Sequence, residues 1–590
     1  MKDPQPLDRA GRAALADVAL GRQAPDLVLR NGRVVNVFTG QIESADVAIS
    51  AGRIAALGRY RAEHELDLAG CYVTPGFIDG HVHLESAHLV PSEFARAVVP
   101  RGTVAVVADP HELANVGGVD ALRWFIRDAA ATPLRVHTMV PSCVPASPFE
   151  TPGAVLGPQM VAGLRREPGV SGLAEVMNVP GVLAGDPELL AKLAAFDGGL
   201  IDGHAPGLSG AQLCAYLDHD IRSDHESTTA AEVREKVGRG MYIGLRQGSS
   251  ARNLRDLLPA VDDRTARRCF LVTDDRSPAD LADLGHLDDC LRICVAEGMD
   301  PVRAVTLATL NPAEYLGARD RGAIAPGYVA DLVVLTDLRE FRATAVLIDG
   351  CEVARDGAPL WACAPVPPPA ALLGSMHLAP VTADRFAVPV SGAFVRVIEA
   401  TPGQLRTGSS VVPAPVRDGQ VIADPAAGLA KLAVLERHHG GGGGGLGLVR
   451  GLGLRRGALA STMAHDAHHL IVCGVDDRDM AAAVNFLIGC GGGFAVAAGE
   501  TVIAALPLPV AGLLSPQPFA DVAGQQRMVR RALCGLVDGD HDPFDTLQFL
   551  ALTVIPTLKL SDRGLVDVDR WRHVDLFVAQ PQADCQRPAG

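Results

Sequence analysis

Short runs of branched apolar residues alternate with amphipathic stretches through the middle of the chain. The strand-like runs read TVAVVAD, RVHTMV, SGLAEVM, GLIDGHA, IRSDHES, MYIGLR and CFLVTDD. The helix-like stretches between them include GGVDALRWFIRDAA, DPELLAKLAAF and LSGAQLCAYLDH. Such alternation is typical of parallel strands joined by crossover helices. Because residues 75–320 also approach the ~250 residues typical of a barrel, we predict a (β/α)8 barrel and an α/β fold class.

Shorter strand patterns flank this region on both sides. Branched apolar residues with turn signals at Asn31-Gly32 and Ala51-Gly52 fill residues 27–73, and a similar pattern returns at 322–350. We predict one small β-sandwich domain built from residues 1–74 and 321–365. Two unrelated β patches are the alternative interpretation.

A third block follows the proline-rich stretch PVPPPA. We predict that residues 366–590 form an additional C-terminal α+β domain. The glycine run Gly440–Gly445 within it is expected to be a mobile loop.

The net charge of the chain bears on which kinds of molecule it can bind. The chain has 590 residues, and 53 Lys and Arg against 68 Asp and Glu give a net charge of −15. No basic run interrupts this acidity, which argues against nucleic acid as the main partner. The twelve cysteines are scattered without a CxxC pair, and the N-terminal stretch lacks the apolar core of a secretory signal. We therefore expect a cytoplasmic protein that does not associate with a membrane.

The first candidate site residues lie in the string GFIDGHVHLES. Asp79, His81 and His83 alternate, so on a strand all three project from one face. At the carboxyl end of a barrel strand they would point into the mouth of the barrel, where such folds place their active sites. Two imidazoles at this spacing can bind one divalent ion, although an isolated HxH is usually a surface or core feature.

Further residues with metal-ligand chemistry follow the later strand-like runs. Glu175, His204, His225 and Asp274 each come after an apolar run and before a turn or helix. For any one of them, a helix cap or a solvated side chain is the ordinary explanation. Their recurrence in order after successive strands instead indicates a shared metal site.

Longer strings carry a resemblance to a known family. They are PGFIDGHVHLES, PSEFARAVVPRGT, VVADPHELANV, AEVMNVPGV, DGHAPGLSG, IRSDHE, LVTDDR, ATLNPAEYLG, GAIAPGYVADLVVL, GALASTMAHDAHHLIVCG and LPLPVAGLLS. With these strings the sequence resembles the adenine deaminases of the amidohydrolase superfamily over nearly the whole chain. Two departures are the histidine in the segment ESAH, at position 88, and an expanded glycine run at 440–445.

The resemblance implies a metal-dependent hydrolase of purine salvage. It implies two divalent ions, Mn²⁺ or Fe²⁺ with Zn²⁺ as an alternative, which activate a water that attacks C6 of adenine and gives hypoxanthine and ammonia. In the resemblance one ion is held by His81, His83 and Asp274, the other by His204 and His225, and Glu175 bridges them. We expect adenine as the small-molecule substrate and a homo-oligomer, specifically a dimer.

Several residues are candidates for proton transfer or substrate contact. Asp274 is expected to accept a proton from the attacking water and pass it towards the amine, and His111 to orient the water or donate to the developing centre. Glu175 is counted as catalytic through its bridging position. The remaining candidates are Asp79, Glu85, Asp109, Glu112, Glu226 and Asp275, of which Asp109, Glu112 and Asp275 are also ordinary helix caps and Glu226 is a candidate donor to the ring nitrogen.

A dense cluster in the third block adds His465, Asp466, His468 and His469. It could supply substrate contacts, another metal position or a subunit contact, and a structural polar network is an equal alternative. Its role stays open at this level.

Three other functions compete with adenine deamination. The zinc nucleobase deaminases are excluded, because HLE at 83–85 matches their H-x-E string but no PCxxC exists in the chain. Hydrolysis of a cyclic amide or N-acyl group, or deamination of a related aminopurine, would use the same metal site. A non-catalytic metal-dependent assembly protein would bind metal without turnover.

Overall fold

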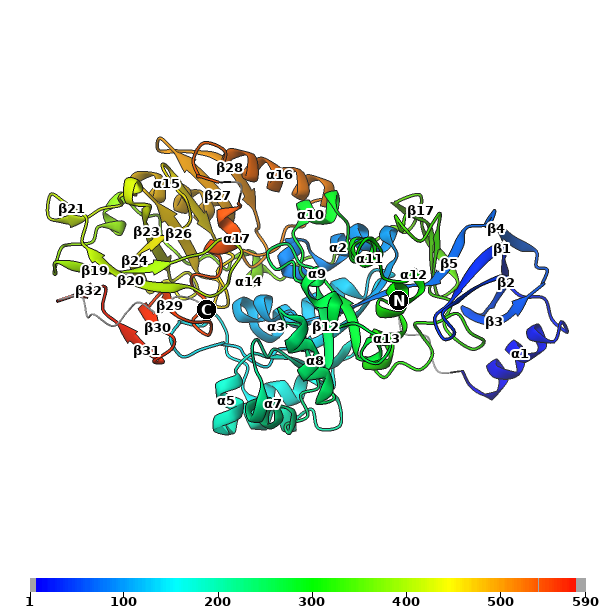
Figure 1. Cartoon of the computed structure of the whole chain (residues 1–590). Helices are drawn as coiled ribbons and strands as arrows, with labels where there is room; N and C mark the ends of the chain where they lie inside the picture. Colours follow the sequence, from blue (N-terminus) through cyan, green and yellow to red (C-terminus); the bar gives the residue numbers. More distant parts are fainter. Residues whose placement is uncertain (1–6, 540, 580–590) are drawn as a thin grey trace. The chain divides into compact units, whose positions relative to one another are not determined.

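The computed structural model describes residues 7–539 and 541–579. The chain divides into two compact units. The first contains Met1–Asp109, Phe125–Ser142 and Val161–Val366, and the second contains Pro110–Trp124, Cys143–Met160 and Pro367–Gly590. Each unit has its own sheets, which Figure 1 shows in different colours along the chain. The predicted domain boundaries at 74, 320 and 365 remain proposals.

Eight parallel strands form the centre of the first unit. In chain order they are β6 (Phe77–His83), β7 (Thr103–Ala108), β8 (Arg135–Val140), β9 (Val170–Val176), β10 (Leu200–Gly203), β11 (Ser223–Asp224), β12 (Tyr242–Arg246) and β13 (Cys269–Val272). Neighbours pair in parallel from β6 to β10 and from β11 to β13. The short strand β14 (Asp274–Asp275), directly after β13, pairs in parallel with β6 and closes the ring. The predicted (β/α)8 barrel is confirmed.

The junction between β10 and β11 depends on a glycine. Gly203 N donates to Ser223 Oγ at 3.1 Å, and a Cβ on Gly203 would lie 2.1 Å from the carbonyl oxygen of Ser223. A side chain at this position would push the two strands apart, so glycine permits their close approach.

Helices with defined ends connect the barrel strands. Capping residues define some of these ends: Asp186 accepts from the backbone at the start of α6 (Pro187–Ala194), and Thr229 does so at α8 (Ala230–Gly238). The other helices of this region are α2 (Pro91–Val98), α3 (His111–Ala129), α4 (Pro158–Leu164), α5 (Val179–Ala184), α7 (Gly210–Leu217), α9 (Leu254–Leu257), α10 (Pro278–Asp283), α11 (Leu287–Ala296), α12 (Pro301–Leu307) and α13 (Leu310–Tyr315). Among the described residues, no helix combines the length and apolar character that a membrane crossing requires.

The two flanks of the barrel share one sheet. Its nine strands are β1 (Leu27–Asn36), β2 (Gln41–Ser50), β3 (Arg53–Gly58), β4 (His64–Asp67), β5 (Tyr72–Pro75), β15 (Leu332–Leu335), β16 (Ala343–Ile348), β17 (Cys351–Arg355) and β18 (Ala358–Pro359). The flanks meet where β5 pairs antiparallel with β15, with Val73 opposite Val334. Helix α1 (Arg9–Ala19) buries Leu15 and Val18 against this sheet. The two flanks therefore share one sheet, as predicted, whereas their arrangement as a β-sandwich stays a prediction.

The second unit is built on another nine-stranded sheet. Its strands are β19 (Phe394–Glu399), β20 (Gly408–Pro413), β23 (Leu429–Leu435), β24 (Gly444–Arg450), β25 (Ala458–Ser461), β26 (Leu470–Gly474), β27 (Gly493–Ala498), β28 (Thr501–Pro507) and β32 (Phe577–Val578). Helix α15 (Asp477–Cys490) packs Met480, Val484 and Leu487 into an apolar cluster of this sheet. A three-stranded sheet of β29 (Leu558–Ser561), β30 (Gly564–Asp567) and β31 (Arg572–Val574) follows, and α16 (Phe519–Ala532) contacts β28. This mixture of strands and helices confirms the α+β prediction.

The glycine run corrects one expectation. Gly444 and Gly445 lie within strand β24 and pair with Leu435 and Val434 of β23, so only the preceding glycines belong to the hairpin loop. A Cβ on Gly445 would lie 2.1 Å from the carbonyl oxygen of Ser561. The glycines at 440–445 therefore form the hairpin turn and also allow close packing of β24 against the segment at Ser561.

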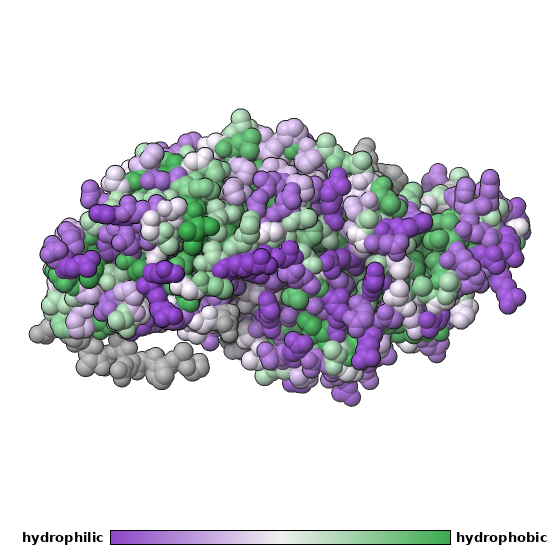
Figure 2. Space-filling view, turned by 90° about the horizontal axis from the view of Figure 1, so that it is seen from above, coloured by the Kyte–Doolittle hydropathy of each residue, from purple (hydrophilic) through white to green (hydrophobic). Residues whose placement is uncertain are grey.

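The surface of the molecule is mixed in character. Figure 2 shows hydrophilic residues over most of the visible face, with hydrophobic residues in small separate areas between them. This distribution is ordinary for a globular surface, where scattered apolar side chains need no partner.

A buried lysine joins the loops that follow β10 and β11. Lys236 of α8 is fully buried, and its Nζ donates to Asp224 Oδ2 at 2.8 Å, Glu232 Oε1 at 2.7 Å and the carbonyl oxygen of Ala205 at 2.7 Å. Asp224 Oδ1 accepts from the backbone N–H of Ala205 at 2.8 Å. Burial raises the pKa of Asp224, but Lys236 outweighs it and holds this pKa below its ordinary value. The ion pair thus fixes the two loops next to His204 and His225.

We predict that Lys236→Met lowers the free energy of unfolding by about 3–5 kcal/mol, because it leaves the buried carboxylate of Asp224 without its cation. Urea denaturation followed by circular dichroism measures this change. The matched control is Arg239→Met, which removes an exposed basic group from the C-terminal end of the same helix and should change stability by less than about 0.5 kcal/mol. Equal stability of the two variants would contradict the prediction.

Candidate functional site

The carboxyl ends of five barrel strands bring the six predicted metal ligands together. His81 and His83 lie at the end of β6, and Glu175 lies at the end of β9. His204 directly follows β10, and His225 directly follows β11. Asp274 lies in β14, the short strand after β13. All are buried except His204, which is partly buried. Since parallel strands meet at one edge of a barrel, this clustering follows from the fold.

His83 lies at the centre of the first group of ligands. Its Nε2 is 3.1 Å from His81 Nε2, 3.2 Å from Asp274 Oδ1 and 3.4 Å from Glu175 Oε1. His81 Nε2 is 3.5 Å from the same oxygen of Asp274. His81, His83 and Asp274 therefore converge on one point, with Glu175 beside them.

Glu175 connects this group to a second one. Its Oε2 is 2.5 Å from His204 Nδ1 and 3.2 Å from His225 Nε2, while its Oε1 faces His83. The His81 and His225 rings stack with centroids 3.7 Å apart. One carboxylate thus faces imidazoles of both groups.

Contacts behind the ligands orient the two imidazoles of β6. His81 Nδ1 donates to Asp202 Oδ2 at 2.7 Å, and His83 Nδ1 donates to the carbonyl oxygen of Asp109 at 2.9 Å. Burial lowers the pKa of His81 and His83, but the carboxylates of Asp202, Asp274 and Glu175 outweigh it and raise the pKa of both rings, so without a cation a proton on Nε2 faces a carboxylate. A cation would take the place of those protons, and the two Nε2 atoms, 3.1 Å apart, would then direct their lone pairs at it.

The carboxylates of the site are anionic. Burial raises the pKa of Glu175, but the histidines at 204, 225 and 83 outweigh it and hold this pKa well below its usual range. For Asp274, burial is likewise outweighed by His81, His83 and Arg246, so its pKa is also well below its usual range. Imidazole nitrogens and ionised carboxylates are ligands that suit zinc, iron or manganese. The residues of this cluster therefore fit the divalent metal site that the sequence predicts.

Asp79 points away from this cluster although it lies on the same strand as the two histidines. Its Oδ2 accepts from Thr273 Oγ1 at 2.6 Å and lies 3.2 Å from His286 Nε2, and its Oδ1 accepts from the backbone of Thr273 and His81. Burial raises the pKa of Asp79 to about 7. The residue joins β6 to the segment after β13 and so supports the position of the ligands.

The other candidates on this unit have different surroundings. Asp109 contributes its backbone carbonyl oxygen to His83, and Asp275 accepts from Ser86 Oγ. Glu85 is buried in the short 3₁₀ turn Leu84–Ala87, where its carbonyl oxygen accepts from His88 Nδ1 at 3.0 Å. His88, the departure noted in the sequence, is therefore a buried structural contact.

Sequence reasoning missed two residues that hold the site together. Asp202 orients His81 and accepts from Tyr315 Oη at 3.1 Å, and Arg246 donates to Glu226 and to Asp274. A signal for both was present, since Asp202 stands two residues before His204 and Arg246 ends MYIGLR, a strand-like run that had supplied no candidate.

His111, Glu112 and the C-terminal cluster lie in the second unit. Glu112 Oε1 is 3.7 Å from His465 Nδ1, and its Oε2 is 3.7 Å from His468 Nε2. Asp466 Oδ1 is 3.6 Å from His465 Nδ1 and 3.9 Å from His111 Nε2. All five side chains are buried.

The protonation of His468 bears on what this cluster can bind. The backbone N–H of Ala464 donates to His468 Nδ1 at 3.3 Å, so the proton of the neutral ring is on Nε2. In that tautomer Nε2 faces Glu112 as a donor. Glu112, His465 and His468 also lie close enough together to hold a metal ion, so the metal position and the polar network predicted from the sequence both stay proposals.

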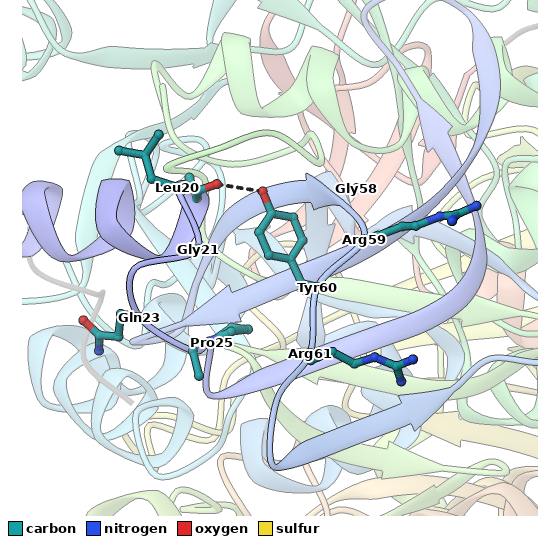
Figure 3. A pocket seen from close by; sticks show the side chains of 10 residues that line it. Leu20, Gly21, Gln23, Pro25, Gly58, Arg59, Tyr60 and Arg61 are labelled. Carbon is teal, nitrogen blue, oxygen red and sulfur yellow. Dashed lines mark hydrogen bonds between the residues drawn. The ribbon is translucent and has the colours of Figure 1, made fainter.

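A pocket on the N-terminal sheet lies away from the predicted site residues. Figure 3 shows it between the end of α1 and the segment after β3, lined by Leu20, Gln23, Arg59, Tyr60 and Arg61 among others. Tyr60 Oη donates to the carbonyl oxygen of Ala19 at 2.9 Å. No histidine or carboxylate lines this pocket, so it offers no acid–base or metal chemistry.

Comparisons with known proteins cover almost the whole chain. A family model described as "Amidohydrolase family" matches residues 72–353, and one described as "Adenine deaminase C-terminal domain" matches residues 404–572. A protein named adenine deaminase 2 from Carboxydothermus hydrogenoformans is 47% identical over 555 residues, which cover 94% of this chain and 97% of that one. An adenine deaminase from Nitratidesulfovibrio vulgaris is 48% identical over 558 residues, with coverage of 94% and 97%.

Among solved structures, the L-hydantoinase from Arthrobacter aurescens is 16% identical and covers 57% of this chain and 97% of its own, with a TM-score of 0.42. Identity near one half over the full length of the curated relatives is far beyond what a shared fold alone produces. The chain belongs to the adenine deaminase family of the amidohydrolases.

Proposed function

We infer that this chain hydrolyses adenine to hypoxanthine and ammonia. The family relationship spans both units, and the relatives of similar length carry the name adenine deaminase. The observation that carries the chemistry is the convergence of His81 Nε2 and His83 Nε2, 3.1 Å apart, beside the anionic carboxylates of Glu175 and Asp274. Such a site is suited to a hydrolysis that begins with an activated water.

We propose that the six ligands hold two divalent ions, Mn²⁺ or Fe²⁺. His81, His83 and Asp274 would hold one ion, His204 and His225 the other, and Glu175 would contact both. Metal ions bound at such a site lower the pKa of a coordinated water from about 16 towards about 7, which supplies a nucleophile at neutral pH.

Asp274 is the proton acceptor in this proposal. Its Oδ2 is engaged by Arg246 at 2.9 Å, which leaves Oδ1 directed at the point where the ligands converge. As the water oxygen bonds to C6 of adenine, Oδ1 accepts a proton from the water. The same carboxyl then donates this proton to the amino nitrogen, and the C6–N bond breaks to release ammonia.

Glu226 is the proposed donor to the purine ring. Its Oε1 lies 4.0 Å from His204 Nδ1 and 3.8 Å from His225 Nε2, at the edge of the ligand cluster. Oε1 accepts from Arg246, so the proton that Glu226 gives to N1 as the water oxygen adds to C6 is carried on Oε2. The same oxygen regains a proton from the C6 hydroxyl as the carbonyl of hypoxanthine forms. Adenine and one water are thereby converted to hypoxanthine and ammonia.

Further parts of the proposal concern the cell and the assembly. We propose that the reaction serves purine salvage in the cytoplasm and that the enzyme acts as a homodimer. His111 and the cluster at His465, Asp466 and His468 keep their predicted roles in orienting water or contacting substrate as proposals.

Replacing the proton acceptor should abolish most turnover. We predict that Asp274→Asn lowers kcat for adenine by about 10²- to 10⁴-fold, the usual contribution of a general base, because the amide cannot accept the proton of water. Hypoxanthine formation by chromatography and ammonia release measure the change. Asp275→Asn is the matched control, since the neighbouring carboxyl accepts from Ser86 instead, and equal losses in both variants would contradict the assignment.

Metal removal should abolish turnover reversibly. We predict that chelation followed by dialysis leaves an inactive chain, and that anaerobic addition of Mn²⁺ or Fe²⁺ restores activity in step with binding of two ions per chain. Mass spectrometry of bound metal and assays with adenine measure both quantities. Full activity of the metal-free chain would refute the proposed site, whereas metal binding with ring opening of a lactam and no ammonia from adenine would refute the proposed substrate.

A further inference from the structure

Arg246 is a buried cation at the end of β12 that neither the sequence motifs nor the proposed metal ligands account for. It is 3% exposed. Its strand lies between β11, which is followed by Glu226, and β13, which is followed by Asp274. The seventh barrel strand thus places a positive charge between two carboxylates of the candidate site.

The guanidinium of Arg246 donates hydrogen bonds to three side chains. Nη1 donates to Glu226 Oε1 and to Asp274 Oδ2, the latter at 2.9 Å, and Nη2 donates to Asn253 Oδ1 at 3.2 Å. A planar guanidinium fork can hold several acceptors in one geometry, which an ammonium group cannot do. Because both terminal nitrogens donate to side chains of the protein, Arg246 is oriented to position those side chains.

The contact with Asp274 determines which oxygen faces the site. Oδ2 is held by Arg246, while Oδ1 lies 3.2 Å from His83 Nε2 and 3.5 Å from His81 Nε2. The backbone of Asp274 has φ +56°, a left-handed conformation that a non-glycine residue keeps only when its surroundings hold it. Without the guanidinium, the carboxylate would be free to rotate about its side-chain bonds.

The contact with Glu226 sets the distance between the two acids of the proposed reaction. Both carboxylates accept from the same Nη1 atom, so one nitrogen fixes their separation. Asn253, in the loop before α9, holds the other nitrogen and prevents the guanidinium from turning.

We propose that Arg246 is the positioning residue of this site: it fixes Asp274 with Oδ1 towards the imidazoles and holds Glu226 at a set distance from it. The expected effect on turnover rests on the proposed function. The expected effect on metal affinity rests on the ligand geometry alone. Partners of metal ligands typically contribute 10- to 100-fold to metal affinity or activity.

The test compares Arg246→Met and Arg246→Lys with the full-length wild-type chain. We expect the dissociation constant for Mn²⁺, measured by competition with a chelating dye, to rise about 10- to 100-fold in Arg246→Met. At saturating Mn²⁺, kcat for adenine should fall by a similar factor while KM changes little, because the interaction lost is not with the substrate. Arg246→Lys should recover part of both losses, since it restores the charge without the fork.

Two further variants keep the test decisive. Asn253→Ala leaves Arg246 in place but frees its Nη2, and it should weaken Mn²⁺ binding in the same direction by a smaller factor. Arg276→Met is the matched control, because this buried arginine bonds to the carbonyl oxygen of Gln247 and to Asp289 instead, and it should leave the Mn²⁺ dissociation constant unchanged. Far-UV circular dichroism verifies that each variant is folded, and Asn253→Ala carries the test if Arg246→Met is not.

The outcomes separate this inference from the proposed function. If Mn²⁺ affinity and kcat in Arg246→Met stay within about twofold of wild type, or if KM alone rises, Arg246 is not a positioning residue. If the wild-type chain binds Mn²⁺ but releases no ammonia from adenine, the proposed function fails, and the dissociation constants still decide the role of Arg246.

Discussion

The candidate site of the barrel unit depends on the convergence of two imidazole nitrogens in a buried space. The Nε2 atoms of His81 and His83 lie 3.1 Å apart because the Nδ1–H of each ring donates to a fixed acceptor, Asp202 for His81 and the carbonyl oxygen of Asp109 for His83. Rings held in this way can direct both Nε2 atoms at one cation. The anionic side chains of Glu175 and Asp274 supply the compensating charge, so four side chains from three strands form one electrostatic unit.

Further buried charged side chains hold the candidate metal ligands in place, and the two basic ones, Lys236 and Arg246, each have an acidic partner. Lys236 pairs with Asp224 beneath the loops that carry His204 and His225, and Arg246 pairs with Glu226 and Asp274 across the mouth of the barrel. Isolated buried ions would be strongly destabilising, and only close pairing with further hydrogen bonds makes them tolerable. The ends of the barrel strands are therefore held by side-chain contacts that the strand ladder alone would not provide.

The second unit concentrates buried polar groups of another kind. Glu112 lies 3.7 Å from His465 and 3.7 Å from His468, which is longer than a hydrogen bond. The tautomer that Ala464 imposes on His468 distinguishes this cluster from the barrel site, although both contain histidines and carboxylates. The same residue types therefore have different chemistry in the two units because the hydrogen bond on the other ring nitrogen differs.

By itself, the sequence determined the fold class and the strand ends that carry the ligand candidates. Both can be recognised from neighbouring residues alone. The string GFIDGHVHLES alternates with a period of two, and each of the other candidates follows an apolar run, namely Glu175, His204, His225 and Asp274. Only the tertiary structure decided that Asp79 turns to Thr273, that Asp202 orients His81, that Arg246 holds Asp274 and that Gly444 and Gly445 belong to a strand. The physical reason is that the partner of a buried polar group, or the space beside a glycine, is set by segments far away in sequence that the fold places opposite it.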